Sequence, residues 1–303
     1  RGKAVLQNLL KTADVVTENY RTDTMAKLGL GYDNLKDINP ALIYCAISGF
    51  GHTGPYASRG GYDLIAQGMS GLMSFTGEGP GRPPVKVGAP VCDITAGILA
   101  AMGILAAYVN RLKTGQGQMV DTSLFEAGIT LSYWQSAIAL ATGMAPGPMG
   151  SAHPLNGPYQ AVETSDGWIT FSGANTRNWL RLLDLLDLPE LAEDLRFKDN
   201  AGRMANLEEL MELLSVEFRK KPRDTWLDAL EEANIPAGPV LNVNEMHVDP
   251  HTRARDMVTE VNHDRIGSVE TIGCPVKFSE TPSGVNFAAP LYAQHTRDVL
   301  AEF

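Results

Sequence analysis

Residues 42–48 read LIYCAIS, an apolar run with strand-forming residues that follows the chain break Asn39-Pro40 and ends before Gly49. Such a run is typical of an interior strand in a parallel sheet, where both faces are covered by helices. Upstream, apolar residues recur at helical spacing over residues 3–10, and residues 13–17 read as a short buried strand. The stretch therefore predicts an α/β fold with a parallel sheet.

The next elements continue this alternation. Helices are expected near residues 22–28 and 62–74, and residues 94–113 carry both a start signal, Asp93, and stop signals, Arg111, Lys113 and Gly115. A strand follows over residues 118–122, and Ser123 with Glu126 has the form of a capping box that opens a helix to about residue 142.

The predicted order of secondary structure changes after the Gly/Pro-rich residues 143–157. Two short strands, 159–164 and 168–172, are joined by the turn Ser165-Asp166-Gly167 and predict a hairpin. Helices are expected at 176–186, 206–220 and 224–233, with a turn into a strand at 235–240, which indicates a small α+β lobe. Past residue 248 we expect two strand-like stretches, 258–261 and 269–278, and a helix from about residue 296.

Composition limits the function classes. The chain of 303 residues is longer than one hydrophobic core usually supports. Its net charge of −10 gives no overall attraction for nucleic acid or anionic lipid. Any anionic ligand must therefore be held by a local basic cluster. Three scattered cysteines and six dispersed histidines fit neither a disulfide framework nor a metal site. The longest apolar stretch, 94–109, is interrupted by Gly97 and Gly103, so we expect no membrane span, and a cytoplasmic location.

Asp93 is the carboxylate of greatest interest. It reads first as the N-cap of the helix over 94–113, accepting amide hydrogens of the first turn. A second role can coexist with capping, because the helix dipole and exposed amides keep such a carboxylate ionised, as a nucleophile requires. No Gly-x-Gly-x-x-Gly, Walker sequence or Gly-x-Ser-x-Gly elbow is present to suggest other chemistry.

The chain resembles the class III coenzyme A transferases, the CaiB/BaiF group that includes formyl-CoA and crotonobetaine-CoA transferases. The resemblance rests on Asp93 with Gly97, residues 110–118 (NRLKTGQGQ), residues 61–67 (GYDLIAQ) and residues 17–21 (TENYR). It extends over residues 150–160, 166–168, 238–240 and 294–297, and succinyl-CoA-dependent dicarboxylate transferases look nearest.

The resemblance implies a Rossmann-like large domain over residues 1–157, an inserted small α+β domain over 158–248, and a return to the large domain over 249–303. The chain opens without methionine inside a helical pattern, so we expect a missing N-terminal part of that domain. The family also implies a homodimer of two interlocked rings. If the source is a eukaryote, the mitochondrial matrix is the alternative location.

Asp93 matches the family's catalytic aspartate, which forms an acyl anhydride and then an aspartyl-CoA thioester while CoA passes from an acyl-CoA to a small carboxylic acid. The only cofactor implied is coenzyme A as the acyl-CoA substrate, with no metal. The resemblance places Tyr62 near the acyl group and His153, in the loop 150–157, near the acceptor. Candidate contacts to CoA are Asn19, Tyr20, Arg21, Lys27 and Arg59, and packing or solvated surface roles remain the alternative for each.

Two other readings stay open. The related α-methylacyl-CoA racemases carry a histidine where this sequence has Tyr62, because removing a proton from either face needs two acid/base groups. A tyrosine with an ordinary pKa of about 10 is a poor base at neutral pH, which favours transfer. The other alternative is an inactive or truncated relative that binds CoA or a partner protein.

Overall fold

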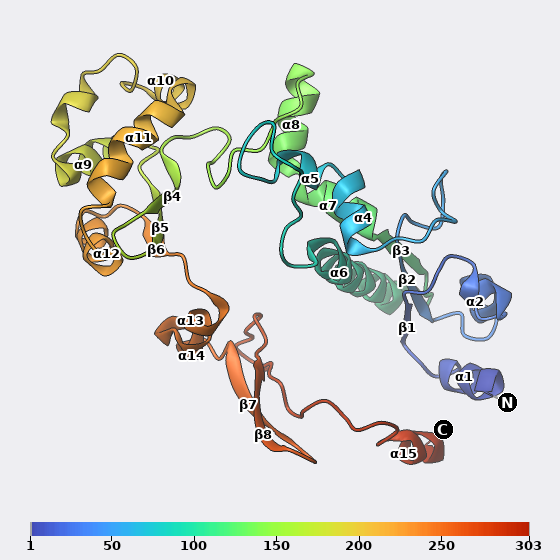
Figure 1. Ribbon diagram of the computed structural model, residues 1–303. Coiled ribbons are helices and arrows are strands. Elements are labelled where there is room, and N and C mark those ends of the chain that lie inside the picture. Colours follow the sequence, from blue (N-terminus) through green and yellow to red (C-terminus); the bar gives the residue numbers. More distant parts are fainter. Residues whose placement is uncertain (1, 303) are drawn as a thin grey trace. The chain divides into compact units, whose positions relative to one another are not determined.

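The structure is a computed structural model that describes residues 2–302 (Figure 1). Contacts divide the chain into two units, Arg1–Ser151 and Ala152–Phe303, and each is described by itself. The sequence placed the first boundary six residues later, after residue 157. The expected return of residues 249–303 to the large domain stays a prediction.

The first unit is built on a parallel sheet. Its strands are β1 (Val15–Glu18), β2 (Ile43–Ser48) and β3 (Met119–Ser123), in the order β1-β2-β3. β2 pairs with both neighbours in parallel, with Val15 opposite Ile43 and Ser48 opposite Ser123. Residues 43–46 of β2 are at most 2% exposed. The predicted interior parallel strand and the α/β class are therefore confirmed.

Helices flank this sheet, and the longest, α6, packs against β2, β3 and α7 (Figure 1). Arg111 in its last turn donates to the carboxylate of Asp14 at 2.5 Å and to the carbonyl oxygen of Ala41, which ties the end of α6 to the strand starts. Gly115 ends the helix with a φ of 73°, as predicted. The helices are α1 (Gly2–Leu10), α2 (Thr24–Lys27), α3 (Tyr32–Leu35), α4 (Asp63–Met69), α5 (Leu72–Phe75), α6 (Val91–Thr114), α7 (Leu124–Leu131) and α8 (Tyr133–Thr142).

Two expected helices are each broken in two. The helix predicted over 62–74 is interrupted between α4 and α5 at Gly71, whose φ of 91° is left-handed. The helix predicted from Ser123 is interrupted at Ser132, whose hydroxyl donates to the carbonyl oxygen of Ile129. Ser123 caps α7 as predicted, accepting the N–H of Glu126 at 3.2 Å. Within the described residues, α6 alone is long and apolar enough to cross a membrane. Core helices of soluble proteins also have this length and composition, so the property alone does not indicate a membrane span.

The second unit begins with an antiparallel sheet of β4 (Tyr159–Glu163), β5 (Trp168–Ser172) and β6 (Ala237–Pro239), which confirms the predicted hairpin. Its core gathers Trp179, Phe197, Phe218 and Trp226. The helices around it are α9 (Thr176–Leu186), the 3₁₀ turn η1 (Pro189–Ala192), α10 (Asn200–Ala205), α11 (Leu207–Phe218) and α12 (Arg223–Glu232).

Beyond this core lie α13 (Val243–Val248), α14 (Pro250–Ala254), the antiparallel pair β7 (Val258–His263) and β8 (Gly267–Ile272), and α15 (Thr296–Glu302). Helix α13 was not predicted from the sequence. Its signal was a complete capping box, in which Asn242 accepts the N–H of Glu245 and the Glu245 carboxylate accepts the N–H of Asn242.

A contact between two glycines closes the loop that follows β2. A Cβ atom placed on Gly61 would lie 2.6 Å from the Cα of Gly49, and one on Gly49 would lie 2.7 Å from the Cα of Gly61. Real Cβ atoms do not approach backbone this closely, so only glycine at both positions allows the two ends of the loop to touch. The same loop borders the site described below.

We predict that Gly61→Ala lowers the free energy of unfolding by about 1–3 kcal/mol, because overpacked backbone must separate. Thermal or urea unfolding followed by circular dichroism measures the change. Gly79→Ala is the matched control, since a Cβ there meets nothing within 4 Å. Equal stability of the two variants would refute the glycine contact.

Candidate active site

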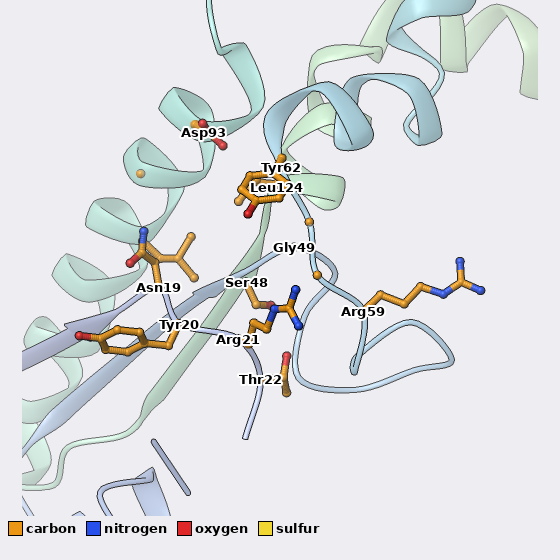
Figure 2. A pocket seen from close by; sticks show the side chains of 14 residues that line it. Asn19, Tyr20, Arg21, Thr22, Ser48, Gly49, Arg59, Tyr62, Asp93 and Leu124 are labelled. Carbon is orange, nitrogen blue, oxygen red and sulfur yellow. The ribbon is translucent and has the colours of Figure 1, made fainter. Parts of the chain in front are cut away.

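A pocket of about 430 Å³ opens at the carboxyl ends of the three parallel strands (Figure 2). This edge of a parallel sheet is where ligands of α/β proteins usually bind. The sheet contributes residues that end or follow each strand, α6 contributes one wall, and the loop after β2 contributes another. The lining residues are Asn19, Tyr20, Arg21, Thr22, Ile47, Ser48, Gly49, Arg59, Gly60, Gly61, Tyr62, Asp93, Gly97 and Leu124.

The prediction that Asp93 is the N-cap of its helix is wrong. α6 begins at Val91, with Pro90 as the preceding residue, so Asp93 is the third residue inside the helix. The cap comes instead from Asp63 of α4, whose Oδ1 accepts the N–H of Cys92 at 2.9 Å. Sequence reading favours a local cap, whereas this one comes from 29 residues upstream. The Asp93 carboxylate thus lines the pocket instead of capping the helix.

Asp93 has a raised pKa. Desolvation by its surroundings is the larger cause, and the negative charge of Asp63 is the second. The expectation that the helix start would favour ionisation is therefore outweighed by these two effects. A carboxylate with a raised pKa is more basic than a free one, which favours attack on a carbonyl carbon.

Cys92, the neighbour of Asp93, does not compete as a nucleophile. Its side chain is fully buried, and burial followed by the charge of Asp63 raises the pKa of its thiol to about 11. The thiolate is the reactive form of cysteine, so this group stays protonated and inert at neutral pH.

Glu18 organises the start of the stretch 19–22. It is 8% exposed, and its Oε2 accepts the N–H of Tyr20 at 2.8 Å while its Oε1 accepts the hydroxyl of Tyr44 at 3.3 Å. The Nε2 atom of His52 lies 4.0 Å from the same carboxylate. This role of Glu18 was not predicted, although a carboxylate at the end of an apolar strand is a usable signal.

Two arginines border the pocket. The guanidinium of Arg21 lies against Gly60, where an added Cβ would be 3.3 Å from it. The guanidinium of Arg59 stacks 4.0 Å from the ring centre of Tyr56, and Figure 2 shows this side chain extending away from the other labelled residues. The exposed aromatic Tyr20 shares this border with them. Arg21 and Arg59 thus both place positive charge at the border of the pocket, although their guanidinium groups do not lie together.

Six of the eight residues predicted for the site line this pocket, and two do not. Lys27 is exposed in the last turn of α2 and is absent from the lining. His153 belongs to the second unit, where its ring stacks on Tyr159 at 5.2 Å and its Nδ1 accepts the N–H of Leu155. The roles of Lys27 and His153 stay predictions. The six that line the pocket are Asn19, Tyr20, Arg21, Arg59, Tyr62 and Asp93.

Across residues 2–302, no group of three or more His, Cys, Asp or Glu side chains is arranged to hold a metal ion. The charged side chains that line the pocket are those of Asp93, Arg21 and Arg59.

Comparison with known proteins finds a matching family and several relatives. The family model described as CoA-transferase family III matches residues 1–296. The succinate–glutarate CoA-transferase of Agrobacterium fabrum is 38% identical over 301 residues, covering 99% of this chain and 75% of that protein. The human succinyl-CoA:glutarate CoA-transferase is 33% identical over 302 residues, covering 100% of this chain and 69% of that protein.

A solved structure shares the fold. The crystal structure of a CaiB/BaiF family protein from Brucella suis superposes with a TM-score of 0.87 at 38% identity, covering 99% of this chain and 78% of that one. The α/β architecture with a parallel sheet thus matches an experimental structure.

We predict that Asp93→Asn stabilises the protein at neutral pH. A carboxyl whose pKa is raised by folding binds its proton more tightly in the folded state, so the parent loses stability as pH rises from the unfolded to the folded pKa. The advantage of the variant should therefore grow over that range and vanish at lower pH. Urea unfolding between pH 4 and 8 measures it. Asp228→Asn, on the exposed face of α12, is the control, and an equal effect of both substitutions would contradict the prediction.

Proposed function

The chain belongs to CoA-transferase family III, and from this we propose that it moves coenzyme A from succinyl-CoA to a small carboxylic acid through Asp93. The observation that carries the proposal is the position of Asp93. Its carboxylate lines a pocket at the carboxyl edge of the sheet, is free of helix capping, and has a pKa raised by desolvation.

The proposed reaction runs through two covalent forms of Asp93. Its carboxylate oxygen attacks the thioester carbonyl of the donor, and the C–S bond breaks to give an acyl anhydride and CoA thiolate. The thiolate then attacks the Asp93 carbonyl, which forms an aspartyl-CoA thioester and releases the donor acid. The acceptor carboxylate repeats the sequence in reverse and leaves as its CoA thioester. The bonds broken and formed are alike in energy, so the cycle needs no ATP.

The residues around Asp93 support these steps. Arg21 and Arg59 provide positive charge for the phosphates of CoA on a chain of net charge −10. Tyr20 presents an exposed ring beside them, suited to stacking on a nucleotide base. Because the neighbouring thiol of Cys92 stays protonated, Asp93 is the nucleophile at this end of the helix.

Names of relatives support a dicarboxylic acceptor. The relatives from Agrobacterium fabrum and human are named for succinate or succinyl-CoA and glutarate, and one from Haloarcula hispanica, 37% identical, is a succinyl-CoA:mesaconate CoA-transferase. That match covers 97% of this chain and 75% of the Haloarcula protein. We therefore propose a small dicarboxylic acid as acceptor.

Transfer is favoured over racemisation by the composition of the pocket. Within the described chain, the residues that line it include one carboxylate and no histidine, and Tyr62 stands beside Asp93 in the lining. Racemisation needs a second acid/base group that works near neutral pH. An interlocked homodimer and a cytoplasmic or matrix location remain part of the proposal.

We predict that Asp93→Ala and Asp93→Asn each abolish transfer, because the covalent intermediates cannot form. The assay incubates the full-length protein with succinyl-CoA and a panel of carboxylates and detects new CoA esters by mass spectrometry. Hydroxylamine should inactivate the parent in the presence of succinyl-CoA by cleaving the aspartyl thioester. Asp228→Asn should retain activity. An active Asp93→Asn variant, checked by mass for deamidation, would show that another group carries the chemistry.

We predict that Gly97→Ala stabilises the protein but weakens the binding of acyl-CoA. Gly97 lies one turn after Asp93 in the lining, and a Cβ there meets nothing within 4 Å. The substitution should stabilise α6 by up to about 1 kcal/mol and raise the KM for acyl-CoA about tenfold, because the new methyl group occupies ligand space.

Unfolding and initial-rate measurements test the two effects together. Gly103→Ala in the same helix is the contrast, because its Cβ would lie 2.7 Å from a side-chain carbon of Val120. That variant should lose stability. An unchanged KM in Gly97→Ala would mean that acyl-CoA does not pass along this face of α6.

A further inference from the structure

A short chain of hydrogen bonds links α4 to the segment that carries Asp93. The side chain of Gln67 is fully buried, and its Oε1 accepts the N–H of Val87 at 2.8 Å. Its Nε2 donates to Oδ2 of Asp63 at 2.7 Å, and Oδ1 of Asp63 accepts the N–H of Cys92 at 2.9 Å. Three bonds thus connect the approach to α6, the helix α4 and the first turn of α6.

The bonded amide of Cys92 is among those at a helix start that lack an intrahelical partner. Pro90, the residue at the cap position, makes no side-chain hydrogen bond, so Asp63 takes over that task from another helix. Cys92 is the residue next to Asp93. The bond therefore fixes the backbone immediately before the proposed nucleophile.

The polarity of this chain of bonds is determined. The backbone N–H of Val87 can only donate, so the oxygen of Gln67 must face it, and the amide nitrogen of Gln67 must face Asp63. Asp63 then receives two N–H groups, one on each oxygen. A carboxylate meets this demand, whereas an asparagine at this position offers one acceptor and would turn a donor toward either Gln67 or Cys92.

We propose that Asp63, held in place by Gln67, is a positioning residue that sets the orientation of the first turn of α6 and thereby aims the Asp93 carboxylate into the pocket. The inference rests on the proposed nucleophilic role of Asp93. It assigns Asp63 no contact with substrate. Tyr62, the preceding residue, faces the pocket while Asp63 faces the helix start, so one turn of chain serves both tasks.

Asp63 also acts on Asp93 by its charge. The groups that share the surroundings of Asp93 are Asp63 of α4, the protonated thiol of Cys92 on its own helix, and the pocket residues Tyr20, Arg21, Arg59 and Tyr62. Asp63 is the charged group that raises the pKa of Asp93, after desolvation. Neutralising position 63 should therefore lower the pKa of Asp93 and shift the acid limb of kcat/KM to lower pH.

The test compares D63N with the double variant D63N/Q67E in the full-length protein. D63N turns an amide NH₂ toward either the NH₂ of Gln67 or the N–H of Cys92, and we expect kcat to fall about 100-fold as the nucleophile is misplaced. The KM for succinyl-CoA should change little. In the double variant the new amide at position 63 can accept from Cys92 and donate to the new carboxylate at position 67, which still accepts from Val87. All three bonds and the net charge are restored, and kcat should recover to within about tenfold of the parent.

The pH profile separates positioning from a structural role alone. D63N should shift the acid limb of kcat/KM downward, and the double variant should shift it less because a negative charge returns nearby. Parent-like kcat in folded D63N, or a double variant with no more activity than D63N, would overturn the proposal. An unfolded double variant would overturn it too, because the reversed bonds should hold the turn. Activity in Asp93→Asn would instead defeat the proposed function, so the two failures are distinguishable.

Discussion

The parallel pairing of β2 with both of its neighbours is the constraint on which the site depends. Parallel strands place their carboxyl ends at one edge, so residues far apart in sequence, such as Tyr20, Ser48 and Leu124, meet around one pocket. The interior position of β2 in turn requires that its side chains are apolar on both faces. The polar residues of the site are thereby confined to the loops beyond the strands and to the start of α6.

Those loops need their own supports, because each leaves the sheet without a regular hydrogen-bond pattern. Glu18 holds the chain after β1 through the N–H of Tyr20, and the contact of Gly49 with Gly61 closes the loop after β2. Asp63 completes the set by holding the start of α6. Each support is buried or partly buried. Two of them are carboxylate side chains, and the third is a contact that the lack of a side chain on glycine allows. Glu18 and Asp63 support the pocket without lining it, whereas Gly49 and Gly61 both support it and line it.

Local sequence signals predicted the elements well where the relevant interaction is local. The apolar run of β2, the stop signals of α6 and the Ser123 cap all depend on neighbours within a few residues, and each was confirmed. The cap of α6 was mispredicted because the residue that supplies it lies 29 positions away, and no periodicity encodes that distance. The breaks at Gly71 and Ser132 were missed for a related reason, since apolar spacing continues through both.

The charge arrangement follows one physical logic. A chain with net charge −10 repels a polyanion at long range, so attraction must act within a few ångströms, where arginines at the pocket border face little screening. At this short range the charge of Asp63 raises the pKa of Asp93. Desolvation raises the pKa of the Asp93 carboxyl, and the neighbouring thiol of Cys92, which is fully buried, is held protonated by the same effect. Asp93 is exposed whereas Cys92 is fully buried, so under the proposed function the carboxylate oxygen and not the sulfur is the reactive atom.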